Sequence, residues 1–267
     1  MRWLFTILFV LCPLFAFADE KEEDKGRLTR FLQDTLSGAG RDVQIEGFEG
    51  ALSSNATMKS LIISDAKGPW LTLNGIELVW TRSAILKGRI EVEKLTAKEI
   101  LIPRLPESEK APPSPEASGG FALPELPVSV NIGEINAARV DIGEPVFGVA
   151  TTVSLFGNLV LLDGTGATKL DITRTDGQQG HIQLEAGYAN ADEILAMDFG
   201  LQEAPEGIAA TLLSLPGQPS VDLSVKGTGP IDQYIANITL STDGLSRLTG
   251  NIATKIQPEL DGNEVET

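Results

Sequence analysis

His181 is the only histidine of this 267-residue chain, so a serine or cysteine nucleophile would have a single histidine available as its base. It stands in an alternating run with Ile182 and Leu184, and such alternation is typical of a β-strand. We therefore interpret His181 as an ordinary polar strand residue. The sequence predicts no catalytic triad built on it.

Ligands for metals and phosphates are also scarce. Cys12 is the only cysteine, so zinc sites of the usual kind lack ligands. The glycine-rich run Asp163–Lys169 lacks the spacing of a phosphate-binding loop, and Asp171 and Asp176 lack that of a calcium loop. We expect no metal, no cofactor and no enzymatic activity. A hydrolase or sugar-modifying enzyme with scattered carboxylates is kept as a third hypothesis.

Residues 1–18 have the layout of an export signal. Arg2 precedes the apolar run Leu4–Phe15, and Ala16-Phe17-Ala18 supplies the small residues that a signal peptidase reads. The apolar run is short for a bilayer, which needs roughly 20 residues, although an uncleaved membrane anchor is an alternative. Cys12 lies in this segment, so the mature chain is expected to contain no disulfide.

The formal net charge of the chain is −16. Such a chain is repelled by nucleic acid and by bare anionic membrane surfaces, so neither is expected as a ligand.

The elements that follow read mainly as strands. Between Arg41 and Pro106, apolar and polar residues alternate in short runs that are broken at glycines. At Asn74-Gly75 the apolar parity changes, which allows a tight hairpin or a bulge within one long strand. We favour the bulge, because the parity also changes within Arg89–Pro103, where no turn residue is present.

The pattern of Arg89–Pro103 occurs a second time in Ser129–Gly143. The apolar positions of the two segments match at a constant offset of 40 residues, from Ile90 and Val130 to Ile102 and Ile142. This agreement indicates a repeated supersecondary unit. To keep one face apolar, each copy needs two slips of register, which we place in the first copy near Lys94 and Lys98.

Composition divides the rest of the mature chain. Residues 26–106 are predicted to hold a helix over Gly26–Gly40 and the start of the sheet. Residues 107–127 are rich in proline, serine and glycine and are predicted to be a disordered loop. Strand-like runs return over 128–256, interrupted by a predicted helix at Glu206–Leu215. The polar segment 257–267 is interpreted as the end of a fragment.

Several stretches, taken in order, resemble the amino-terminal part of the TamB family, the inner-membrane subunit of the translocation and assembly module, within the AsmA-like superfamily. The motifs are degenerate, but their order is more specific. The resemblance covers most of Arg41–Gly250 and is carried by Ile45–Leu52, Ile62–Leu71, Val79-Trp80, Leu86–Ile90, Leu215–Pro219 and Gly227–Pro230, with Ala236–Gly250.

This resemblance implies a mainly β fold: a long twisted antiparallel sheet curled into an open apolar groove, with short amino-terminal and internal helices. It implies a periplasmic bridge that assists outer-membrane protein assembly, including that of autotransporters, or phospholipid transport between the membranes. The implied partner is the outer-membrane barrel protein TamA. The family's partner-binding carboxy-terminal region is not in this chain, and the leader looks cleavable where the family usually has an anchor.

Apolar parity also defines a candidate site. A face of alternating apolar residues must be covered, or it invites association, so it suits acyl chains or an unfolded β-strand. A closed structural or adhesive β-domain is the alternative, in which the same face is fully packed. The residues predicted to line the groove are Leu71, Leu73, Ile90, Val92, Ile100, Ile102, Val130, Ile132, Val140 and Ile142.

Overall fold

The computed structural model of the protein describes residues 41–50, 53–87, 89–107, 129–162 and 164–253, with several positions between 26 and 37. The predicted leader (1–18), nearly all of the predicted loop (107–127) and the predicted tail (257–267) lie outside the described residues.

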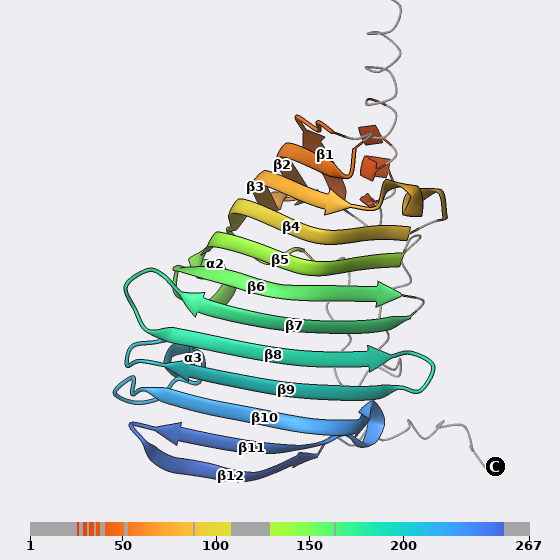
Figure 1. Ribbon diagram of the computed structural model, residues 1–267. Helices are drawn as coiled ribbons and strands as arrows, with labels where there is room; N and C mark the ends of the chain where they lie inside the picture. Colours follow the sequence, from red (N-terminus) through yellow and green to blue (C-terminus); the bar gives the residue numbers. More distant parts are fainter. Residues whose placement is uncertain are drawn as a thin grey trace, which may run out of the picture.

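The described chain forms one mainly β sheet that is open and curled rather than closed into a barrel, as predicted. Twelve strands follow one another in sequence order across it (Figure 1). They are β1 (Asp42–Glu46), β2 (Asn55–Asp65), β3 (Gly68–Trp80), β4 (Arg89–Ile102), β5 (Ser129–Ile142), β6 (Thr151–Leu162), β7 (Thr165–Arg174), β8 (Gly180–Ala189), β9 (Ile194–Glu203), β10 (Val221–Pro230), β11 (Ile235–Thr242) and β12 (Leu245–Ala253).

Short helices join some of these strands. They are η1 (Arg82–Lys87), α2 (Glu144–Phe147), α3 (Ile208–Leu212) and η2 (Ile231–Gln233). The described positions from Gly26 to Leu36 are also helical, in agreement with the predicted amino-terminal helix. The helix predicted over Glu206–Leu215 is shorter than expected, because only α3 is helical there.

Strands β4 and β5 pair in parallel, whereas every other neighbouring pair of described strands is antiparallel. The prediction of a wholly antiparallel sheet is therefore wrong at this position. Parallel neighbours need a crossover of a dozen or more residues, and the chain between Ile102 and Ser129 is long enough to provide one. These two strands are the two copies of the repeated pattern. They lie side by side with Ile90 opposite Val130 and Ile102 opposite Ile142.

Bulges keep the apolar residues on one face. Strand β3 runs without interruption through Asn74-Gly75, so one long strand is confirmed and the hairpin is wrong. The ladders to β2 and β4 skip Gly75, whose φ is 59°, without a shift of register, so the irregularity lies in the backbone of Gly75 and adds no extra residue. The ladder between β4 and β5 omits Glu93 and Gly133 and resumes at Lys94, and it also omits Lys98. Each omission reverses the parity of the strand, as the apolar pattern requires.

The two ends of the sheet differ. On β1, the Val43 N–H donates to Ser37 Oγ at 3.0 Å, and Gln33 Nε2 donates to the Val43 carbonyl at 3.3 Å. Side chains of the amino-terminal helical segment therefore occupy backbone groups of this edge strand. Strand β12 pairs with β11 and with no other described strand, and eight of its nine residues are exposed.

An ion pair ties the β2–β3 turn to the end of β4. Arg104 donates from Nη2 and Nη1 to the two carboxylate oxygens of Asp65, at 2.6 and 2.7 Å. The backbone N–H groups of Lys67 and Glu107 also donate to Asp65. The Asp65 side chain is 5% exposed, and the Arg104 bond, followed by the Glu107 N–H, holds the pKa of Asp65 well below its usual range.

Gly143, which follows β5, lies very close to the backbone at the end of β4. Its N–H donates to the Ile102 carbonyl, and a Cβ at this position would lie 2.3 Å from the Pro103 carbonyl oxygen. We expect Gly143→Ala to lower the free energy of unfolding by about 1–3 kcal/mol in urea melts, because backbone must move. Gly229→Ala is the control, since a Cβ there meets nothing within 4 Å. Equal stability of the two variants would contradict the close packing.

Ionisation of Asp65 should make the stability of the fold depend on pH. Because its folded pKa is depressed, its stabilising effect is present above the unfolded value of about 3.9 and is lost as the pH falls further. Asp65→Asn should melt at a lower temperature than the parent at pH 7. Between pH 4 and pH 2 the difference should shrink. A difference that is constant over this range would show that Asp65 ionisation does not contribute.

Candidate functional site: the apolar face of the sheet

The ten residues predicted to line a groove lie on one face of the sheet, which we call the apolar face. Cross-strand pairing places Leu73, Ile100 and Val140 in one row. Val92 and Ile132 are neighbours in a second row, Ile90 and Val130 in a third, and Ile102 and Ile142 in a fourth. Leu71 packs against the buried cluster that contains Ile100 and Val140.

The apolar face extends well beyond those ten residues. One cross-strand row is apolar on every strand from β2 to β12. None of its members is among the ten residues predicted to line the groove. The row consists of Met58, Ile76, Ala97, Ala137, Leu155, Ile172, Ile182, Leu201, Leu223, Leu240 and Leu248. The alternation of Ile182 with Leu184 and of Leu223 with Val225 was the available signal.

Accessibility varies along the apolar face. Near the amino-terminal end, Val92 and Val140 are 7% and 3% exposed and belong to packed clusters. On the central strands the corresponding side chains, including Leu159, Leu170 and Leu184, are only half-buried. On β12, Leu248 and Ile252 are exposed by 47% and 43%. The predicted residues therefore mark the better-packed part of the face, and the accessible part lies on later strands.

Two helical elements cover parts of this face. Leu32 of the amino-terminal segment is buried in the cluster that contains Val43 and Trp80. Helix α3 lies behind the sheet in Figure 1, where Ala209 and Ala210 are clustered with Leu201 and Val221. Its own Leu212 and Leu213 are exposed by 58% and 48%, so α3 covers the face with its other side.

A buried carboxylate holds α3 in place. Glu203 Oε2 accepts the Ala209 N–H at 2.7 Å, and Glu203 Oε1 lies 3.4 Å from Arg174 Nη1. Arg174 also donates to Asp176 at 2.8 Å. The side chains of Glu203 and Arg174 are 3% and 7% exposed. Burial opposes ionisation of Asp176, but bonds from Arg174 and Thr151 outweigh it and hold the pKa of Asp176 well below its usual range.

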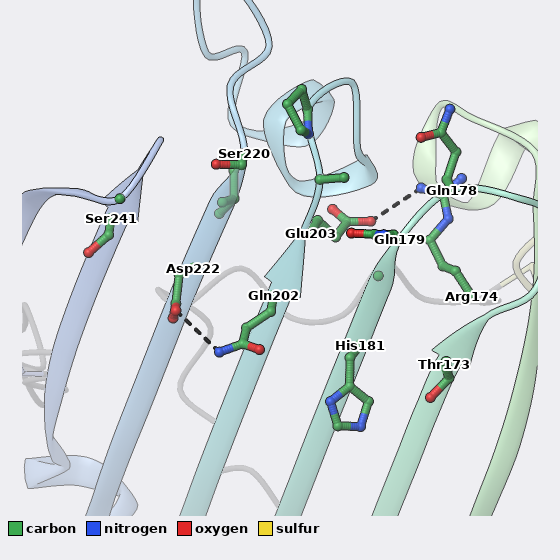
Figure 2. Close-up of a pocket in the computed structure, with 15 residues that line it drawn as sticks. Thr173, Arg174, Gln178, Gln179, His181, Gln202, Glu203, Ser220, Asp222 and Ser241 are labelled. Carbon is green, nitrogen blue, oxygen red and sulfur yellow. Dashed lines mark hydrogen bonds and ion pairs between the residues drawn. The ribbon is translucent and has the colours of Figure 1, made fainter.

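The opposite face of the sheet is polar and carries two cavities. One, of about 790 Å³, lies at the ends of β7–β11 and is lined on the polar face by Thr173, His181, Gln202 and Asp222 (Figure 2). At the strand ends it also reaches Arg174, Glu203 and Val221. The second, of about 660 Å³, lies over β5–β10. His181, predicted to be a polar strand residue, lies on β8, and its Nε2 is 3.0 Å from Asp171 Oδ2. Neither cavity was predicted.

Among the described residues, no three or more His, Cys, Asp or Glu side chains are placed to hold a metal ion. No helix among them is both long and apolar enough to cross a membrane.

Comparison of the chain with family models, curated proteins and solved structures gives no match.

Loss of the Glu203 carboxylate should release α3. In Glu203→Ala the buried Ala209 N–H loses its acceptor, which costs about 2 kcal/mol of stability, and amide hydrogen exchange at Ala209 and Ala210 should accelerate. Asp198→Ala is the control, because it removes an exposed ion pair with Lys226 and should cost less than about 1 kcal/mol. Unchanged exchange at Ala209 and Ala210 in the first variant would show that packing alone holds α3.

Proposed function

We propose that the protein is a periplasmic bridge whose apolar face carries phospholipid acyl chains or unfolded outer-membrane β-strands between the inner and outer membranes. By resemblance, its partner is the outer-membrane barrel protein TamA, and its role is in outer-membrane protein assembly, phospholipid transport, or both. Transport along such a face requires no catalytic group.

One observation carries the proposal: an open sheet with an apolar row on every strand from β2 to β12. Contact with such a face is worth about 0.8 kcal/mol for each CH₂ group removed from water. A cargo of repeated CH₂ groups or of alternating apolar side chains therefore gains free energy at each step without any particular residue. The half-buried side chains of the central strands leave part of this gain available.

The alternative is a closed structural or adhesive domain. That reading needs a second layer over the apolar face, as in a sandwich of two sheets. Within the described chain, one sheet is present, and α3 and the amino-terminal helical segment cover parts of it. The half-buried Leu170 and Leu184 favour the open conduit over the closed domain.

Cross-linking tests the proposal directly. A photo-reactive amino acid at Leu184, on the apolar face, should form adducts with lipid or with an outer-membrane protein in living cells. The same group at Thr239, an exposed position on the polar face, is the control. The mass of the Leu184 adduct identifies the cargo. Absence of any adduct at Leu184, or equal adducts at both positions, would exclude the conduit.

A paired charge substitution on β11 separates folding from transport. Ile238 and Thr239 are adjacent and point to opposite faces. In Ile238→Glu the carboxylate lies in the path of an apolar cargo, at a cost of several kcal/mol unless it is hydrated, so transport should fall at least tenfold while the melting temperature changes little. Thr239→Glu should retain both. Unfolding of the first variant alone would favour the closed domain.

A further inference from the structure

The two cavities lie next to each other along the strands, and we call the pair the trough. On β8, His181 lines the first cavity and Gln183 lines the second, and β9 contributes Gln202 and Gly200 in the same way. Asp171 joins the two, because it is bonded to His181 at 3.0 Å and accepts from Gln183 at 3.3 Å. The trough therefore runs along the strands from the end of β7–β11 toward their middle.

Polar groups of the trough are held in regular rows. Thr173, His181, Gln202, Asp222 and Ser241 occupy matching register positions on β7–β11. Figure 2 shows the first four side by side on adjacent strands, which lie about 4.8 Å apart in a sheet. Gln202 donates to Asp222 at 3.3 Å, which fixes the orientation of its amide. Hydroxyls, amides and an imidazole are thus presented at fixed spacing.

The lysines and the arginine in and beside the trough are paired, whereas the carboxylate of Asp222 is bonded to the Gln202 amide. Lys169 Nζ lies 2.8 Å from Glu185 Oε1, Lys226 is paired with Asp198, and Arg174 is paired with Asp176. These cations are therefore already neutralised, and the chain as a whole carries a net charge of −16. An anionic ligand finds no excess of positive charge here, so the trough suits a neutral polar ligand better than an anionic one.

Phe156 supplies a flat apolar surface at the side of the trough. It lines the second cavity, is 54% exposed, and lies next to Asp171 in the cross-strand row that continues through Gln183, Gly200 and Ser224. A Cβ on Gly200 would meet nothing within 4 Å, so the floor of the trough is open there. An exposed aromatic ring beside rigid hydrogen-bonding groups is complementary to a sugar, which has an apolar C–H face and polar edges.

We propose that this trough binds a neutral glycan whose sugars carry acetamido groups. The sugar hydroxyls and the acetamido N–H and C=O are matched by the amides of Gln178, Gln179, Gln183 and Gln202, since each amide both donates and accepts hydrogen bonds. A protein partner is disfavoured because the core of a protein interface is largely apolar, and Phe156 is the only aromatic side chain that lines either cavity. Apart from the strand ends, where the first cavity reaches Val221, the site lies on the face opposite the proposed conduit, and it does not depend on that conduit.

Titration calorimetry with the tetramer of N-acetylglucosamine tests the proposal. The parent protein should bind it saturably, and Phe156→Ala should weaken binding roughly tenfold, which corresponds to one aromatic contact. Gly200→Val should weaken it at least as much by filling the trough, at a position with room for the added side chain. Leu162→Ala is the matched control, since Leu162 is 37% exposed on the same face of β6 but lines neither cavity. It should bind within twofold of the parent.

The proposal is overturned by no saturable binding to millimolar tetramer, by equal binding of the parent and the Phe156→Ala and Gly200→Val variants, or by preference for an unfolded polypeptide over the tetramer at this face. Thermal melts of each variant confirm that a loss of binding does not reflect a loss of fold. Stronger binding of an anionic glycan than of the tetramer would also count against the proposal, because it contradicts the pairing of charges.

Discussion

A strand turns successive side chains to opposite faces, and the structure depends on keeping the apolar ones together despite irregular spacing in the sequence. A single slip of register would move a whole set of apolar side chains into water. The left-handed backbone of Gly75 and the ladder omissions at Glu93 and Lys98 correct the parity where the sequence changes it. The same corrections occur in β5 opposite β4, so the two long strands remain matched across a parallel pair.

The buried charged clusters lie along one end of the strands, where β2, β4, β7 and β9 end and β3, β8 and β10 begin. The Asp65–Arg104 pair and the Arg174–Glu203 cluster both lie along this side and are well buried. Burying charge is favourable only when partners are fixed, so such clusters add precision of geometry more than net stability. Here they hold a turn against a strand exit and α3 over the apolar face.

Apolar parity was sufficient to predict a mainly β chain, the unbroken strand through Gly75 and the common face of Leu73, Ile100 and Val140. Apolar residues alternate in the same way whether a strand runs parallel or antiparallel to its neighbour. For this reason the parallel pairing of β4 and β5 was not predicted. The Glu203–Arg174 contact joins residues 29 positions apart, and only the folded sheet brings them together. The polar trough was missed for the same reason, because its rows run across strands whereas the sequence runs along them.

One end of the described sheet has its edge groups occupied by Gln33 and Ser37, while the strand at the other end, β12, has no further described partner. The two edges of the sheet therefore differ in their capacity to pair with a further strand. Within the described sheet, β12 is therefore the edge whose backbone groups are left for a further strand, whereas Val43 of β1 already has partners. A curled sheet of this kind has no closure condition to fix its strand number, so its length is set by the supply of compatible strands rather than by its own geometry.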